Sequence, residues 1–380
     1  MARPGADGLR ISVVHSFYRS DQPSGENELV LSEVAALRRH GHDVRLSRRD
    51  TDDAARAWGY PLRAAATTAT GWGSSPAGEI AAHGPDVVHV HNLFPNYGRS
   101  WIQDLTQPLV VTLHNYRPLC ASAILYRDGH VCTDCFTDRL SALRHRCYQG
   151  SVAATLPLTI GQGGVRRRII DRADRLVVLS PTERDYYVRA GVAPERMVEI
   201  PNFLPADLDH GPGPGGDAWL YAGRVTASKG VDEVLAAWPA DVPLVVAGPI
   251  DDPAGMRALA RGKQVDFLGQ VERSEVVARL ATSRGLVFPS RWPETFGLVY
   301  VEALAAGTPV LTTPPGAAAT FVNRDGTGLA VDRLTSADIS RAHDLFPDLR
   351  ATARAVFDAR YTERAHVAAL DALYADVLRT

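Results

Sequence analysis

Short apolar runs alternate with helical patterns along the whole chain, and this alternation is the feature that most limits its fold. Residues 9–14, 87–90 and 109–113 are runs rich in valine, leucine and isoleucine. Between the first two, residues 26–40 repeat apolar side chains every three or four positions, which is typical of a helix buried on one face. Strand-length runs separated by helices predict parallel sheets covered by helices, a doubly wound α/β fold.

The pattern breaks once and then resumes, which predicts two domains. Residues 211–216 are only glycine and proline, and such a segment does not hold regular structure. Strand-like runs begin again at residues 219–221 and continue to residues 328–331. A chain of 380 residues is long enough for two separate cores. We expect a first domain over residues 1–205 and a second over residues 217–359.

The segment of residues 285–303 predicts a site for an anionic ligand. An apolar strand and its exit turn lead to helical spacing that starts at Phe296. A helix that begins just after a strand directs free backbone N–H groups and its dipole at one point. Glu294 and Glu302 flank this helix start, so the segment suits a nucleotide sugar, with phosphate in the middle and hydroxyls at both ends. The alternative is that Glu294 stabilises the helix dipole and Glu302 is solvated.

A second strand–turn–helix segment adds positive charge. Residues 219–222 predict a strand that ends at Gly223, where the backbone can approach a ligand closely. Arg224 and Lys229 follow in the turn and are near enough to hold one diphosphate. The chain has only one other lysine, Lys263, so a lysine in this turn indicates a specific role.

These motifs, in this order, resemble the retaining glycosyltransferases of family 4. The second half contains A-G-R-x4-K-G, E-x7-E and A-A-G-T-P-V-L, at residues 222–230, 294–302 and 305–311. The first half adds S-G-E-N-E, V-H-V-H-N and V-T-L-H-N-Y, at residues 24–28, 88–92 and 111–116. The family more often has two glycines before the first glutamate of that N-terminal loop, and Ser24 replaces one of them.

The resemblance covers nearly the whole chain and implies the GT-B architecture. That fold has two Rossmann-like doubly wound domains that face a central cleft. The first domain would bind the acceptor and the second the nucleotide-sugar donor. The resemblance also implies that a final helix, within residues 360–380, packs back on the first domain.

The resemblance implies transfer of a hexose-type sugar from a nucleotide diphosphate sugar, with UDP expected, to an acceptor hydroxyl. Retained configuration and no catalytic metal are also implied, because positive groups stabilise the leaving phosphate. Glu294 would hold the sugar, Glu302 the ribose, and Gln270 and Val271 the nucleotide base. The implied catalytic residues are His114, Arg224, Lys229 and Glu294. The implied donor-binding residues are Gly223, Arg224, Lys229, Gln270, Val271, Glu294, Thr295, Phe296, Gly297, Leu298 and Glu302. The acceptor-side residues are Ser24, Gly25, Glu26, His91 and Asn92.

Three other functions remain as alternatives. A sugar-nucleotide epimerase uses the same scaffold, and a nucleotide-sugar-binding protein without turnover would keep the fold. Arg224, Lys229 and Glu294 are all present, which disfavours lost turnover. A nicotinamide dehydrogenase would need G-x-G-x-x-G after a strand, and residues 161–164 have a different spacing. The acceptor, in natural-product or cell-surface polysaccharide biosynthesis, is left open.

All four cysteines lie in an insert at residues 117–150 with the spacing C-x11-C-x2-C-x11-C. This spacing predicts a structural zinc ion with four thiolate ligands, and unpaired buried thiols are the alternative. Asp128-Gly129 predicts a hairpin that would bring the sulfurs together. The ligands would be Cys120, Cys132, Cys135 and Cys147.

Charge and hydropathy exclude some partners. The formal net charge of −2 gives no basic field for nucleic acid. No apolar run has the length of a membrane span, and the N-terminus lacks the apolar core of a signal peptide, so we expect a cytoplasmic protein. Arg166–Arg168 follow an apolar stretch, which leaves peripheral membrane contact as an alternative. The oligomeric state is not indicated.

Overall fold

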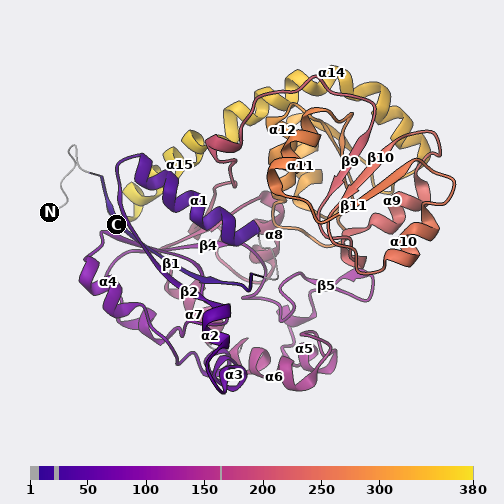
Figure 1. Ribbon diagram of the computed structural model, residues 1–380. Helices are drawn as coiled ribbons and strands as arrows, with labels where there is room; N and C mark the ends of the chain where they lie inside the picture. The colour runs from indigo at the N-terminus through magenta and orange to yellow at the C-terminus, as the bar shows by residue number, and fades with distance from the viewer. Residues whose placement is uncertain (1–7, 21–24, 163–164, 380) are drawn as a thin grey trace.

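The computed structural model describes residues 8–20, 25–162 and 165–379, and the side chains of these residues except 162–168. Two α/β domains lie side by side, and the chain crosses between them twice (Figure 1). Each domain contains a parallel sheet of six strands with helices packed against it, so the predicted doubly wound fold is confirmed. No helix in the described part of the chain has both the length and the apolar character needed to cross a membrane.

The first sheet has the strand order β2-β1-β3-β4-β7-β8. Its central strands are buried on both faces, which is why they appear in the sequence as unbroken apolar runs. The strands are β1 Arg10–Phe17, β2 Asp43–Asp50, β3 Val87–Asn92, β4 Leu109–Leu113, β7 Arg175–Val178 and β8 Met197–Glu199. The helices are α1 Gly25–Arg39, α2 Thr51–Ala55, α3 Tyr60–Thr70, α4 Ala77–His83, α5 Leu140–Arg144, α6 Val152–Gln162, α7 Val165–Arg172 and α8 Pro181–Arg189.

The second sheet repeats this design with the order β11-β10-β9-β12-β13-β14. Its strands are β9 Trp219–Ala222, β10 Leu244–Ala247, β11 Val265–Gly269, β12 Leu286–Phe288, β13 Val310–Thr312 and β14 Gly328–Ala330. Its helices are α9 Val231–Ala237, α10 Pro253–Leu259, α11 Arg273–Ala281, α12 Leu298–Ala305, α13 Ala317–Asp325 and α14 Ser336–Arg360.

The last helix, α15 (Glu363–Val377), packs against the first domain (Figure 1). Val367, Leu370 and Tyr374 belong to the same buried cluster as the apolar side of α1 and the strands of the first sheet. The Arg39 guanidinium of α1 donates to Glu363 at 3.1 and 2.6 Å. The chain end therefore completes the core of the domain in which the chain begins.

The strands predicted at residues 9–14, 87–90, 109–113, 219–221 and 328–331 correspond to β1, β3, β4, β9 and β14, and their bounds agree to within three residues. β1 continues to Phe17, because its C-terminal part stays paired with β2 through Phe17↔Asp50. β8 was not predicted: it has three residues and only Met197 is fully buried, so its apolar pattern is too short to recognise. In the insert, β5 (Tyr126–Arg127) and β6 (His130–Val131) pair in antiparallel fashion, which confirms the hairpin.

Candidate active site

A cavity of about 560 Å³ lies between the two domains, at the carboxyl ends of their strands. Tyr18, after β1, and His114, after β4, contribute from the first domain. The second domain contributes the turn after β9 and the loop before α12. The structure thus brings together these predicted residues: Gly25, Glu26, His114, Gly223, Arg224, Lys229, Glu294, Thr295, Phe296, Gly297 and Leu298.

The central contact of the cavity is an ion pair between Lys229 and Glu294. Lys229 Nζ lies 2.7 Å from both carboxylate oxygens of Glu294. The ammonium also faces the rings of Trp292 and Phe288, at 5.5 and 5.8 Å from their centroids. These contacts hold a single lysine charge at the cavity, which is where the sequence placed it.

Arg224 differs from Lys229 in having no such partner. Its side chain is exposed, and it forms no ion pair within 4.0 Å with any acid that the structure describes. The turn is formed by Gly223, whose φ of 146° favours glycine. Tyr221 donates from its hydroxyl to the Arg224 carbonyl at 2.7 Å, which fixes this turn. Among the described residues of the cavity, Lys229 is held by an acid and Arg224 is not.

Two helices begin at the cavity and face each other. Gly25 starts α1, and Leu298 starts α12. A Cβ at position 25 would lie 2.7 Å from Leu298 Cδ1, the tip of a leucine side chain, so the two helix starts approach each other closely. Gly297 has a φ of 93°, and a Cβ on it would lie 2.7 Å from the Phe288 ring. Helix N-termini carry free N–H groups and a partial positive charge, so both favour an anion here.

Thr295 links the domains beside these helix ends. Its hydroxyl donates to the backbone carbonyl of His114 at 2.9 Å. A second bond across the interface joins the hydroxyls of Thr182 and Thr320, also at 2.9 Å. The cavity is therefore closed on one side by direct contacts between the two domains.

Glu302 lies outside the lining of this cavity and is only 5% exposed. Its Oε1 accepts from Arg273 Nε at 2.6 Å. Arg273 is the first residue of α11, 29 positions earlier in the chain, and no motif in the sequence identifies it. The alternative in which Glu302 is a solvated residue is wrong, because its carboxylate is buried and paired.

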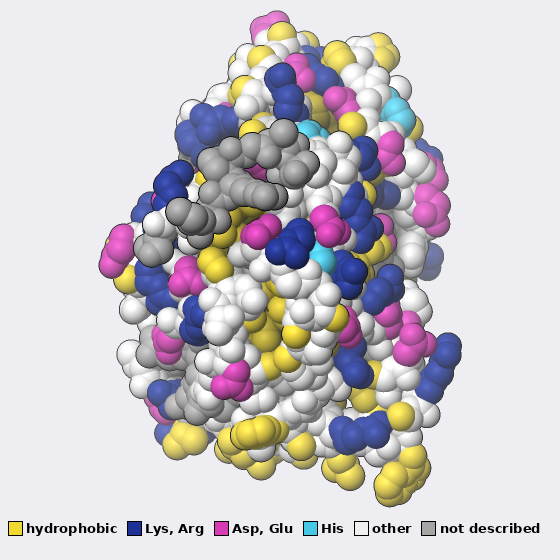
Figure 2. Space-filling view, turned by 90° about the vertical axis from the view of Figure 1, so that its left-hand side faces the viewer, with side chains coloured by type: hydrophobic (Ala, Val, Ile, Leu, Met, Phe, Trp, Pro, Cys, Tyr) yellow, Lys and Arg dark blue, Asp and Glu magenta, His cyan; other side chains and the backbone are white. Residues whose placement is uncertain are grey.

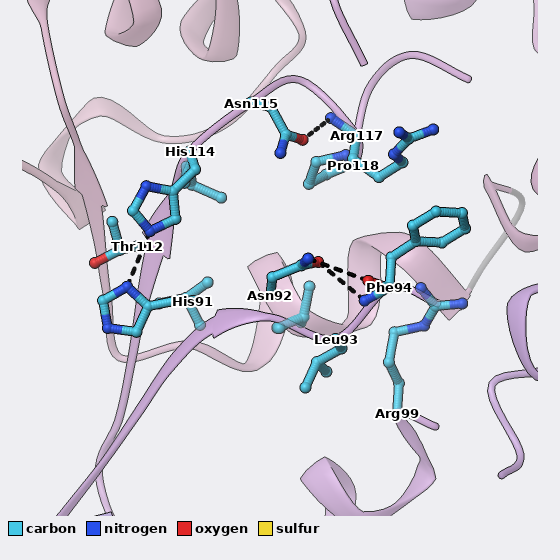
Figure 3. Close-up of a pocket in the computed structure, with 13 residues that line it drawn as sticks. His91, Asn92, Leu93, Phe94, Arg99, Thr112, His114, Asn115, Arg117 and Pro118 are labelled. Carbon is cyan, nitrogen blue, oxygen red and sulfur yellow. Dashed lines mark hydrogen bonds between the residues drawn. The ribbon is translucent and has the colours of Figure 1, made fainter. Parts of the chain in front are cut away.

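Other predicted residues lie further from the cavity. Gln270 and Val271 follow β11 and do not line it; Val271 packs against the core of the second domain. Ser24 lies outside the described residues. His91 and Asn92 line a small neighbouring cavity of about 70 Å³, which they share with His114 (Figure 3).

His114 is held by a buried chain of polar contacts that the sequence did not reveal. His91 Nδ1 and His114 Nε2 lie 2.9 Å apart (Figure 3). His91 Nε2 lies 3.1 Å from Oε1 of Glu33, a fully buried residue of α1. A carboxylate only accepts, so a proton on His91 Nε2 would face Glu33, and His91 Nδ1 would then accept from His114 Nε2.

The charges of this chain are fixed by its surroundings. Burial, and the neighbouring His91, lower the pKa of His114 well below its ordinary value. Burial alone would raise the pKa of Glu33, but the neighbouring histidines, first His91, lower it well below its usual range. Glu33 Oε2 also contacts His366 Nε2 at 3.0 Å, and His366 Nδ1 lies 2.9 Å from the Pro201 carbonyl. Both partners only accept, so both bonds form only when His366 is a cation.

Glu33, His89 and His91 place three possible ligand atoms within 4.8 Å of one another. His89 already bonds the Tyr374 hydroxyl at 2.8 Å and the Thr112 hydroxyl at 2.7 Å. Burial lowers the pKa of His89 to about 3, so it is neutral. We interpret the group as a polar network inside the first domain, with its nitrogens used by protein partners.

The four cysteines lie in the insert as free thiols. Burial, and then the neighbouring Cys120, Cys147 and Cys132, raise the pKa of Cys135 to about 12, which indicates that the four sulfurs share one region. Among the described residues, however, no three of these sulfurs lie within 4.8 Å of one another. Zinc with bonds of about 2.3 Å would draw them closer, so the zinc site stays a prediction.

Glu26 is the acidic residue that the first domain contributes to the cavity. Asn115 Nδ2 donates to its Oε2 at 3.3 Å, while Oε1 is buried without a described partner. Burial raises the pKa of Glu26 to about 8. Its carboxyl group therefore changes charge within the range in which enzymes are assayed.

Two family models match the chain in sequence. The model described as Glycosyltransferase Family 4 matches residues 23–208, and that described as Glycosyl transferases group 1 matches residues 210–357. D-inositol 3-phosphate glycosyltransferase 1 of Catenulispora acidiphila is 30% identical over 294 residues, which are 68% of this chain and 63% of that protein. The corresponding Pseudarthrobacter chlorophenolicus protein is 31% identical over 212 residues, 49% of this chain and 50% of that protein. The chain thus matches about half to two thirds of these relatives' length.

Solved structures share the fold at low sequence identity. Sucrose-phosphate synthase of Thermosynechococcus elongatus has a TM-score of 0.63 at 18% identity, with 98% of this chain and 99% of that chain covered. HepE of Anabaena in complex with UDP has a TM-score of 0.61 at 16% identity, with 97% and 100% covered. The fold and the cleft between the two sheets define a GT-B protein. The two family models place it more narrowly: the chain belongs to the family-4-like glycosyltransferases of this fold.

We predict that tag-free protein carries about one zinc ion per chain, as four thiolate ligands imply. Cys135→Ser should lower the metal content and the melting temperature, because the site would lose a ligand. Elemental analysis and thermal unfolding of both proteins measure this. A metal-free wild type with the same melting temperature after zinc addition would contradict the prediction.

We predict that Glu26→Gln removes a pH dependence of stability. The folded-state pKa is about 8, whereas an unfolded glutamate keeps its ordinary value of 4.5. The unfolded chain therefore ionises first, and wild-type stability should fall as the pH rises from about 4.5 to about 8. Urea unfolding at about pH 5 and about pH 8.5 tests this. The control is Glu28→Gln, an exposed glutamate of the same helix, which should keep the wild-type fall. An unchanged fall in Glu26→Gln would show the prediction to be wrong.

Proposed function

We propose that this protein is a retaining glycosyltransferase that moves a hexose-type sugar from a UDP-sugar to an acceptor hydroxyl. The observation that carries the proposal is the Lys229–Glu294 pair in a cleft faced by two helix N-termini. A cation beside backbone N–H groups suits the diphosphate, and a carboxylate beside it suits sugar hydroxyls. HepE, which shares this fold, has been solved in complex with UDP and with UDP-glucose, which supports the donor class.

The proposed reaction breaks the bond between the sugar carbon and the phosphate oxygen, and forms a bond to the acceptor oxygen on the same face. The leaving phosphate oxygen takes the acceptor proton, so no residue acts as a covalent nucleophile. Negative charge grows on the diphosphate, and Arg224 and Lys229 stabilise it. The N–H groups at the start of α12 add to this charge stabilisation. These positive groups take the place of a catalytic metal.

The remaining polar residues orient the substrates. Glu294 holds sugar hydroxyls next to the reacting carbon. Glu302 holds the ribose, and Arg273 orients its carboxylate through the 2.6 Å hydrogen bond. His114 is neutral and fixed by His91, so it contacts the transferred sugar without adding charge to the cleft. A protein partner orients each of these side chains: Lys229 for Glu294, Arg273 for Glu302 and His91 for His114.

Incubation with a panel of nucleotide sugars tests the proposal against its two alternatives. A glycosyltransferase releases free UDP slowly in water and faster with an acceptor. An epimerase converts one nucleotide sugar into another, and a binding protein without turnover does neither. Methyl glycoside products analysed by NMR in the presence of methanol as a general acceptor report whether configuration is retained. An inverted product would contradict the retaining mechanism.

We predict that Lys229→Ala lowers kcat by about 10²–10³-fold, the usual cost of removing one group that stabilises transition-state charge. Lys263→Ala is the matched control, because it removes the only other lysine, which bonds the backbone carbonyl of Leu235 away from the cleft. Steady-state kinetics and thermal unfolding of both variants separate rate from stability. Near-normal kcat/KM in folded Lys229→Ala would refute the role.

We predict that Glu294→Ala and Glu302→Ala fail differently. Glu302 is assigned to the ribose, so its loss should weaken binding of UDP and UDP-sugar together. Glu294 is assigned to the reacting sugar, so its loss should lower kcat and leave UDP binding nearly intact. Calorimetric titration with UDP, next to steady-state kinetics, measures both effects. Equal loss of UDP binding in the two variants would show that the division of roles is wrong.

A further inference from the structure

A second large cavity, of about 610 Å³, lies entirely within the first domain. Tyr18, Phe94 and Arg117 line it, and they follow the carboxyl ends of β1, β3 and β4. Open α/β sheets bind their ligands at this edge. Tyr18 also lines the cleft between the domains, so the two cavities meet there. We call this second cavity the side cavity.

The side cavity also shares two lining residues with the small cavity that contains the histidine pair. Phe94 and Arg117 line the small cavity that contains His91 and His114, and they lie on its side away from the histidines (Figure 3). A molecule in the side cavity would therefore lie next to both the cleft and the histidine pair. The place suits an acceptor, because the donor-side groups all belong to the second domain.

Among the described residues, the charged side chains that line the side cavity are two arginines, Arg19 and Arg117, and no acid. Neither forms an ion pair within 4.0 Å with a described acid. The Arg117 guanidinium stacks 4.5 Å over the Phe94 ring and 5.4 Å over the Tyr148 ring, and its Nε is buried without a described partner. Arg117 is half-buried and its Nη1 donates to the Ala121 carbonyl at 2.6 Å, so the Nε–H is the group left to favour an anionic group on the ligand.

The rest of the lining is mainly apolar or aromatic. Phe94 and Tyr148 pack edge to face, with centroids 6.2 Å apart. The Tyr60 hydroxyl donates to Asn96 Oδ1 at 2.9 Å, so the ring of Tyr60 is the part left to contact a ligand in the cavity. Leu62 lines the cavity and is 77% exposed, which places it at the mouth. Such walls favour an apolar ligand body.

Apolar side chains continue outside the mouth. Val152, Leu156 and Ile160 repeat every four residues on α6 and form an exposed stripe, while Pro157 and Leu158 of the same helix line the cavity. Trp58, just before α3, is 96% exposed. These helices form the lower end of the molecule in Figure 1, and hydrophobic side chains gather along the lower edge in Figure 2. An exposed apolar patch of this kind marks a binding surface.

We propose that the side cavity binds the acceptor and that this acceptor is an anionic amphiphile. Its acidic group, a phosphate or phosphate ester, lies at Arg117, and its apolar chain runs past Leu62 along α6. Its hydroxyl then enters the cleft beside Tyr18 and His114. The inference rests on the proposed function, because it identifies the acceptor of that reaction. A bilayer or a second copy of the chain would explain the exposed stripe but not the buried Arg117 Nε, which has no described partner.

Binding of dodecyl phosphate, below its micelle concentration, tests the chemistry. Calorimetry should give a dissociation constant at least about tenfold lower than for dodecyl maltoside, which lacks the charge, or for inorganic phosphate, which lacks the chain. Equal affinity for inorganic phosphate and dodecyl phosphate would overturn the proposal. So would equal affinity for the charged and the neutral amphiphile.

Variants then locate the site. Leu62→Glu and Arg117→Gln should each weaken dodecyl phosphate binding by about tenfold or more. Leu62 is exposed, so its variant should fold even if the other does not. The matched control is Leu345→Glu, an exposed leucine of α14 in the second domain, which should bind dodecyl phosphate like the wild type. Equal losses in Leu62→Glu and Leu345→Glu would overturn the assignment.

Two further measurements separate the possible failures. UDP binding should be unchanged in Leu62→Glu; wild-type protein that binds dodecyl phosphate but no nucleotide would refute the proposed function and not the cavity. Co-sedimentation with phosphatidylglycerol vesicles should be prevented by dodecyl phosphate, because both ligands would use the same cavity. Co-sedimentation that dodecyl phosphate does not displace would identify a bilayer surface instead, and would overturn the proposal.

Discussion

A single buried carboxylate, Glu33, determines how the acceptor side of this molecule is organised. It lies on α1, and it contacts His91 of β3 and His366 of α15 at 3.1 and 3.0 Å. A buried charge of this kind is tolerated only when it is paired, and removing one partner costs about 3–5 kcal/mol. Glu33 therefore ties together the start, the middle and the end of the first domain. Through His91 it also connects to His114, which lines the cleft.

The two sheets supply the other half of the design. Each ends its strands at the cleft, so residues that follow β1, β4, β9 and β12 meet there although they lie far apart in the chain. The backbone there depends on two glycines, at positions 223 and 297, whose positive φ would strain any other residue. Backbone N–H groups then lie beside Lys229 and Arg224 in the cleft.

The sequence predicts what local rules govern and misses what depends on distant pairing. The fold follows from alternating runs, and Lys229 and Glu294 stand out because strand ends and helix starts form sites in α/β folds. Glu33 does not stand out, because a glutamate in a helical pattern has the same sequence signature whether it is solvated or buried. Arg273 does not stand out, because it belongs to no motif. Glu33 meets His366 across 333 positions of the chain. The side cavity could not be predicted either, since its lining comes from loops after three strands, from the insert and from α2, α3 and α6.

The two crossings between the domains lie next to each other. Leu204, on the outward crossing, donates from its backbone N–H to the Tyr361 carbonyl at 3.1 Å and pairs with Thr362 on the return. Because the two connections lie side by side, they form one hinge between the domains. Any rotation of one domain against the other must turn about a line through this point. The displacement would then grow with distance from Leu204, so the cleft would open widest at the end far from the hinge. The buried network around Glu33 lies within one domain and would move with it as a unit.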